Sequence, residues 1–254
     1  MSDSILLDVT DGLARITFNR PERLNAVNPD AARRWREIAV TVAESDDVAA
    51  VLLDAEGRAF CAGGDVLEMG ALRDAAVIEQ LADSIHDGHR ILRESTKPIV
   101  AAVQGAVAGG GLGFMLVADV IVASERATFA SKYADIGLTP DCGVSTLLPE
   151  AVGMRRALEL TLTPRTLTAA EALDWGLVTE IAAPDATARR AREIAQAWLA
   201  GASDAFGQAK RLLHAAQARP FQASLDDEAA TIAAAFTGAD AQARIAAFAA
   251  RSRR

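Results

Sequence analysis

Cysteine is scarce in this chain of 254 residues, and its placement excludes several kinds of site. The two cysteines, Cys61 and Cys142, are far apart in the sequence. They therefore form neither a metal-binding motif nor a C-x-x-C redox pair. We expect a reduced, cytoplasmic setting and no metal centre.

Long apolar runs and an excess of basic charge are also missing. Although 51% of the residues are hydrophobic, glycine or aspartate breaks each run well short of a membrane span. The first residues, MSDSILLDVTDGLARITFNR, lack the basic region and cleavage-like site of a secretory signal. The net charge of −8 argues against a nucleic-acid binder and against a basic membrane-surface protein. We predict neither nucleic acid nor membrane as a partner.

Glycine, by contrast, is concentrated where two apolar runs meet. The stretch GAVAGGGLGF lies at this junction, and it contains Gly109, Gly110 and Gly111 in succession. Phe114 stands where a dinucleotide fingerprint needs its third glycine, and neither G-K-[ST] nor G-x-S-x-G occurs. Two interpretations remain: close packing of a helix on a strand, or free N–H groups at a helix start that bind a ligand oxygen. A second glycine loop, FCAGGDVLEM, is the obvious source of a second N–H donor for an oxyanion hole.

Strands and helices alternate over the first two-thirds of the chain. SILLDV and LARITF predict a β-hairpin, whereas residues 29–44 and 74–94 predict helices. The apolar runs AAVLLDA, KPIVAAVQG and VIVAS are typical of buried strands. From about residue 161 the sequence is alanine-rich and mostly helical, and Thr168 with Glu171 forms a capping-box pattern. We predict one α/β domain with a helical C-terminal extension.

Five stretches together resemble the crotonase (enoyl-CoA hydratase/isomerase) superfamily, in the family's order and spacing. They are RPERLNAV, FCAGGDVLEM, GAVAGGGLG, ATFASKYADIGLTPDCG and LTAAEALDWGLVTEI, and the resemblance covers essentially the whole chain. It implies an α/β fold built as a spiral of ββα units. Residues 1–195 would form the core with the acyl-CoA site, and residues 196–254 an α-helical trimerisation region. A homotrimer or hexamer is the implied assembly.

The resemblance also implies which residues contact the substrate, an acyl-CoA thioester. The thioester oxygen would lie between the backbone N–H groups of Gly64 and Gly110, and coenzyme A would enter as part of the substrate, with no separate cofactor. Other implied contacts to substrate or coenzyme A are those of Arg23, Ala62, Asp65, Tyr133 and Arg251. Asp65 has a second interpretation as a helix cap, and the C-terminal RSRR has one as a solvated tail.

The chain departs from the hydratase pattern at both glutamate positions, where it holds Gly113 and Tyr133. An acid remains in the same motif: Asp141 in GLTPDCG, a setting similar to epoxyphenylacetyl-CoA isomerases and enoyl-CoA isomerases. Asp135, also in this motif, is either a second acid or a solvated loop carboxylate. One carboxylate is sufficient to move a proton between two carbons. The alternative for Asp141 is a plain helix N-cap. Tyr133 either bonds the substrate or fills the space of the missing glutamate.

We therefore predict an acyl-CoA enzyme that shifts a double bond, or isomerises an unsaturated or epoxy acyl-CoA, through an oxyanion-stabilised enolate with Asp141 as its acid and base. A hydratase of non-standard mechanism, a thioester hydrolase and a non-catalytic acyl-CoA binder remain alternatives. His86, His89 and His214 sit in charged helical stretches and are predicted to be surface residues. The apolar positions Phe236, Ile245 and Phe248 near the C-terminus are predicted to face another subunit, as exposed apolar patches often do. Their sequence spacing places them on one helix face.

Overall fold

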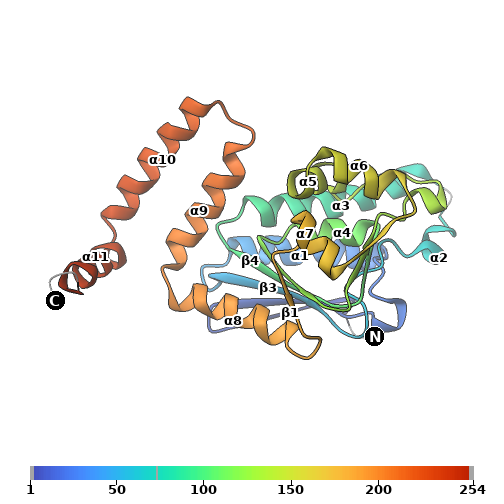
Figure 1. The fold of residues 1–254 in the computed structure, drawn as a ribbon, viewed down its shortest axis with the longest axis horizontal. Helices are drawn as coiled ribbons and strands as arrows, with labels where there is room; N and C mark the ends of the chain where they lie inside the picture. The colour runs from blue at the N-terminus through green and yellow to red at the C-terminus, as the bar shows by residue number, and fades with distance from the viewer. Residues whose placement is uncertain (1–2, 73, 252–254) are drawn as a thin grey trace.

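The computed structural model describes residues 3–72 and 74–251, and a six-stranded sheet forms its centre (Figure 1). The strand order is β1-β2-β3-β4-β6-β9. The strands are β1 (Ile5–Thr10), β2 (Leu13–Phe18), β3 (Ala50–Ala55), β4 (Ile99–Val103), β6 (Val120–Ser124) and β9 (Glu180–Ala182). Asp11 and Gly12, both with positive φ, close the predicted hairpin, so β1 and β2 pair antiparallel. The remaining neighbours pair parallel, as strands joined by helical crossovers do.

A second, three-stranded sheet lies beside the first in the order β5-β7-β8. Its strands are β5 (Ala106–Ala108), β7 (Thr128–Ala130) and β8 (Thr166–Thr168). Strand β5 follows β4 after a turn at Gly105, and it leads directly into the glycine run. The small sheet therefore fixes where the glycine run begins.

Helices cover both faces of the main sheet. The α-helices of the described residues are α1 (Pro29–Glu44), α2 (Val66–Met69), α3 (Ala75–Glu94), α4 (Gly110–Leu116), α5 (Val144–Val152), α6 (Met154–Leu162), α7 (Ala169–Trp175), α8 (Thr187–Ala200), α9 (Ser203–Ala216), α10 (Phe221–Phe236) and α11 (Ala239–Arg251), of which α10 and α11 do not cover the sheet. Short 3-10 helices occur at Pro21–Arg23 and Ala134–Ile136.

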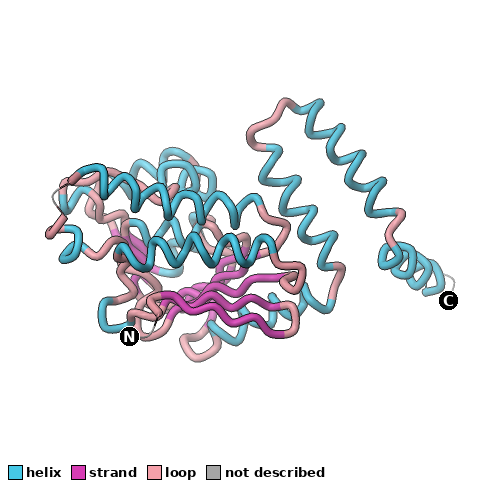
Figure 2. Tube along the Cα trace, turned by 180° about the vertical axis from the view of Figure 1, so that it is seen from behind, coloured by secondary structure: helices cyan, strands magenta, loops and turns pink. Residues whose placement is uncertain are grey.

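Alternation along the strands explains the two helical layers. On β3, Val51 and Leu53 join the large core with α1 and α4, whereas Leu52 joins a small cluster with Ala191 and Ala195 of α8. Successive side chains of a strand point to opposite faces, so an unbroken apolar run indicates a strand buried on both. Figures 1 and 2 show α8 on one side of the sheet and α1, α3 and α4 on the other.

The C-terminal helices leave the core after α8. The buried ammonium group of Lys210 on α9 donates to the carbonyls of Leu92 and Lys97, both at 2.9 Å, and pairs with Asp119 at 3.2 Å. Beyond this anchor, α10 and α11 contain no buried residue among those described, and they extend away from the core (Figure 1). The predicted boundary between residues 195 and 196 falls within α8. Across the described residues, no helix is both long enough and apolar enough to cross a bilayer.

Candidate active site

Two glycine turns meet backbone to backbone above the parallel strands. The turn after β3 contains Gly63, with φ +95°, and the turn before α4 contains Gly109, with φ +53°. A Cβ atom at Gly63 would lie 2.8 Å from the carbonyl oxygen of Ala108 and 3.3 Å from the nitrogen of Gly110. Only glycine fits both the backbone angle and this close approach.

The meeting of the two turns brings the N–H groups of Gly64 and Gly110 to one cavity. Both glycines line it, and Gly110 is the first residue of α4, so its N–H has no partner within the helix. Among the hydrogen bonds of the described residues, neither N–H has an acceptor. The two groups are therefore available to one ligand oxygen.

The other glycines of α4 serve packing. A Cβ at Gly111 would lie 2.1 Å from the carbonyl oxygen of Cys61, and one at Gly113 would lie 2.0 Å from that of Cys142. Neither position admits a side chain on this backbone. The two interpretations of the glycine run thus apply to different glycines.

Asp141 lies beside the α4 glycine turn with one oxygen occupied. Its Oδ1 atom accepts a hydrogen bond of 2.7 Å from the hydroxyl of Tyr133 and lies 3.6 Å from where a Gly110 Cβ would be. The Asp141 side chain is exposed to solvent and lines the cavity. It does not cap α5, whose N-cap is Gly143 with no side-chain cap bond. The carboxylate is therefore open to a ligand.

Tyr133 and the two cysteines keep their protons. Burial, followed by the charges of Cys142 and Asp141, raises the pKa of Tyr133 well above its usual range, so its phenol remains a donor. Burial raises the pKa of the Cys61 thiol to about 12, and burial together with Asp141 raises that of Cys142. Neither thiol has the depressed pKa of a reactive cysteine.

The cavity has a volume of about 590 Å³ and a mostly apolar wall. Its apolar side chains include those of Val27, Ala32, Val66, Met69, Ile78, Leu81, Ile85, Phe114, Ile136 and Leu138. Its charged side chains are Glu79, Lys132, Asp135 and Asp141, of which Lys132 and Asp135 pair with each other at 2.9 Å. An apolar pocket with a few convergent polar groups is typical of a small-molecule site.

Five of the predicted site residues line this one cavity: Ala62, Gly64, Gly110, Tyr133 and Asp141.

The other three predicted residues lie elsewhere. Asp65 is buried, caps α2 by accepting from the Glu68 N–H, and pairs with Arg20 at 3.1 Å. Arg23 is exposed and lies 3.6 Å from the same carboxylate. Arg251 ends α11, at the end of the molecule opposite α2 (Figure 1).

The histidine prediction was wrong for His89. This side chain is buried, its Nδ1 accepts from the Trp35 indole N–H at 2.9 Å, and burial lowers its pKa to about 3. His214 is half-buried and contacts Asp119 at 3.0 Å. His86 is exposed as predicted, but it accepts a hydrogen bond from the Cys142 N–H, directly after Asp141. No sequence motif singled out this contact.

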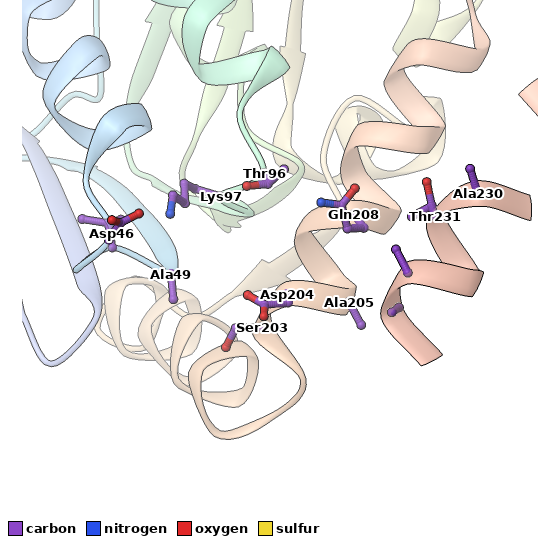
Figure 3. A pocket seen from close by; sticks show the side chains of 13 residues that line it. Asp46, Ala49, Thr96, Lys97, Ser203, Asp204, Ala205, Gln208, Ala230 and Thr231 are labelled. Carbon is purple, nitrogen blue, oxygen red and sulfur yellow. The ribbon is translucent and has the colours of Figure 1, made fainter. Parts of the chain in front are cut away.

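A second cavity, of about 630 Å³, lies between the core and helices α9 and α10 (Figure 3). Asp46, Lys97, Asp204 and Gln208 are among the side chains that line it. No predicted site residue does so. Over the described ranges, moreover, no group of three or more His, Cys, Asp or Glu side chains is placed to hold a metal ion.

Comparisons with known proteins agree on the family, and the relatives that they find are named for several different reactions. The family model for enoyl-CoA hydratase/isomerase matches residues 8–253. The chain is 31% identical over 234 residues to 1,2-epoxyphenylacetyl-CoA isomerase of Escherichia coli (strain K12), covering 90% of this chain and 88% of that protein. It is 34% identical over 233 residues to 4-chlorobenzoyl coenzyme A dehalogenase-2 of an Arthrobacter species, with 91% and 84% covered. The crystal structure of an enoyl-CoA hydratase from Mycobacterium smegmatis superposes with a TM-score of 0.92 at 28% identity, covering 98% and 96%.

Proposed function

The chain belongs to the enoyl-CoA hydratase/isomerase family, and on this premise we propose that it shifts a double bond in an unsaturated acyl-CoA. The observation that carries the proposal is the position of the Asp141 carboxylate in the cavity wall. It lies beside the turn that contributes the Gly110 N–H, and one of its oxygens is held by Tyr133. The packing of Gly113 against the Cys142 carbonyl leaves no room for a second carboxylate there.

The proposed reaction begins with the thioester oxygen between the N–H groups of Gly64 and Gly110. The Asp141 carboxylate takes a proton from C2 of a 3-enoyl-CoA, and the electron pair moves into the thioester to form a dienolate. The negative oxygen of the dienolate is stabilised by the two N–H groups, an arrangement in which each donor contributes about 2.7–4 kcal/mol. Asp141 then returns the proton to C4, which leaves a neutral 2-enoyl-CoA.

Tyr133 supports this chemistry by holding Oδ1. With its raised pKa the phenol stays protonated and donates to Oδ1 throughout, which holds the carboxylate in place. Tyr133 thereby takes the space that the resemblance assigns to a glutamate. We propose that Arg23, which lies beside Asp65, contacts the phosphates of coenzyme A. Arg251 ends α11, which lies at the end of the molecule opposite α2 (Figure 1), so the proposed contact of Arg251 with the nucleotide is with a substrate bound by a second copy of the chain.

A panel of four assays on the purified protein tests the proposal. We expect conversion of a 3-enoyl-CoA to its 2-enoyl isomer as the fastest reaction. The competing outcomes are hydration of crotonyl-CoA, release of free thiol by thioester hydrolysis, and release of chloride from 4-chlorobenzoyl-CoA. A faster rate in any of these three, or no reaction in all four, would overturn the isomerase assignment.

We also propose that the reaction needs no metal ion, because the proton transfer and the oxyanion contacts use only groups of this chain. Dialysis against EDTA is expected to leave the isomerisation rate unchanged. Loss of activity that a divalent cation restores would contradict this.

A further inference from the structure

A side chain of helix α3 makes a hydrogen bond to the Asp141 turn. The Nε2 atom of His86 accepts a hydrogen bond of 3.1 Å from the Cys142 N–H. That N–H belongs to the peptide group that joins Asp141 to Cys142. We propose that His86 is a positioning residue, which fixes this peptide and through it the Asp141 carboxylate. The inference rests on the proposed function, because it assigns His86 to the same reaction.

The turn requires such support because its backbone is unfavourable. Cys142 has φ +50° and Gly143 has φ +73°, so two successive residues are left-handed and the first has a side chain. From within its own segment, the turn is held by the Asp141 carbonyl, which accepts from Val144 N–H at 2.9 Å and from the Tyr133 hydroxyl at 3.3 Å. The contact from α3 fixes the other side of the same peptide group.

The contact also selects one tautomer of the imidazole. A nitrogen that accepts a hydrogen bond has no proton, so the His86 tautomer that makes this contact has its proton on Nδ1. His89, one turn further along α3, is the reverse case: its Nδ1 accepts from Trp35, so its proton is on Nε2. The two histidines of one helix are thus held in opposite tautomers. His86 does not line the cavity, which separates it from groups that exchange protons with the substrate.

Three substitutions test the assignment. His86→Gln keeps an acceptor, because the glutamine Oε1 extends about as far from the backbone as Nε2. His86→Leu has similar bulk and no acceptor. Gln80→Leu, on an exposed position of α3 outside the cavity lining, is the matched control.

We expect the isomerisation kcat of His86→Leu to fall by about 10–10²-fold, since a displacement of about 1 Å can cost about 10²-fold. Its KM is expected to stay within about twofold, because the glycine donors and the cavity wall are intact. His86→Gln should recover to within about threefold of the unsubstituted protein, and Gln80→Leu should match it. Full activity in His86→Leu, or a His86→Gln variant as slow as His86→Leu, would overturn the assignment.

A substrate-free measurement separates this inference from the proposed function. Long-range ¹H–¹⁵N spectra of the protein labelled at histidine distinguish the two imidazole tautomers. We expect the Nδ1–H form for His86 and the Nε2–H form for His89. The imidazole signals that disappear from the spectrum of His86→Gln are assigned to His86. An Nε2–H or doubly protonated His86 at neutral pH would overturn the contact whatever reaction the protein catalyses. The expected tautomers in a protein without isomerase activity would instead overturn the proposed function alone.

Discussion

At the scale of single residues, Asp141 has one oxygen for the substrate because Tyr133 occupies the other. Asp141→Asn retains the shape of the side chain and an oxygen for the Tyr133 hydroxyl, but it removes the base. We expect a folded variant that binds acyl-CoA and isomerises at least about 10²-fold more slowly, within the range of a lost general base. Stopped assays with a 3-enoyl-CoA measure the rate, and calorimetric binding of a saturated acyl-CoA is the control. Unchanged isomerisation would remove Asp141 from the mechanism.

Tyr133→Phe separates support of the carboxylate from proton transfer. The ring keeps its place in the core, while Oδ1 loses its donor at 2.7 Å. A hydrogen bond to a charged group contributes about 1.5–3 kcal/mol, so we expect kcat to fall by about tenfold or more, and less than in Asp141→Asn. The melting temperature of Tyr133→Phe controls for a change of fold. Equal rates in Tyr133→Phe and the unsubstituted protein would show that the phenol only fills space.

His89 predicts how stability responds to acid. Its pKa is lowered by burial from 6.5 to about 3, so the unfolded chain binds this proton more readily than the folded protein does. The free energy of unfolding should therefore decrease as the pH falls below about 6.5, by up to about 1.4 kcal/mol per pH unit, until the pH reaches the folded value.

His89→Asn keeps an acceptor near the Trp35 N–H and does not titrate. Urea denaturation at several pH values between 4 and 7 should give a shallower dependence for this variant, by about one proton. Parallel curves for the two proteins would assign the acid sensitivity to other groups.

Individual residues differ in how far the sequence could predict them. Gly64, Gly110 and Asp141 sit in recognisable motifs, and the structure places all three on one cavity. The buried state of His89 depends on the indole N–H of Trp35, which comes from a different helix. The role of His86 likewise depends on a backbone N–H contributed by a distant turn. The hydrophobic periodicity of α3 reveals neither hydrogen-bond partner, because both partners lie outside this helix.

At the scale of elements, the sequence predicted the long ones well. The helix predicted over residues 29–44 coincides with α1, and α3 begins at Ala75, one residue after its predicted start at Asp74, which caps it. The predicted α/β spiral fold is confirmed by the family match and by the superposition on a hydratase structure. The small sheet β5-β7-β8 was missed, because a strand of three residues is too short to show a hydrophobic period.

Helix α4 offers a test of the oxyanion contacts that uses a matched pair. Gly110→Ala adds a Cβ, which meets the Cys142 Sγ at 3.0 Å, and it keeps the N–H. Gly110→Pro adds similar bulk at the first helical position, where proline is tolerated, and removes the N–H. We expect kcat of the proline variant to be at least about 10²-fold below that of the alanine variant, as for other lost oxyanion donors. Equal rates would show that the thioester oxygen does not bind at Gly110.

At the scale of the whole molecule, the C-terminal helices α10 and α11 extend away from the core (Figure 1), and they expose large apolar side chains. Ile232 on α10 is 71% exposed, and Phe248 on α11 is 67% exposed. Because large exposed apolar patches on soluble proteins mark interaction surfaces, we predict that the protein assembles as a trimer or hexamer through α10 and α11.

Light scattering at micromolar concentration should give a mass of three or six chains. Ile232→Glu combined with Phe236→Glu should lower the mass, whereas Val9→Glu on the edge strand β1 should not. A monomer mass for the unsubstituted protein would contradict the prediction.

The contact of Gly113 with the Cys142 carbonyl has a consequence for how this lineage can change its chemistry. A glutamate introduced at position 113 would place its Cβ 2.0 Å from that oxygen, so it cannot enter unless the turn after Asp141 moves as well. The same turn fixes the carboxylate on which the proposed isomerisation depends. The mutational path to a two-glutamate site therefore passes through variants that have lost the first activity before they gain the second. A library that varies only the two glutamate positions, 113 and 133, should yield no hydratase, whereas one that also varies residues 141–143 opens the path.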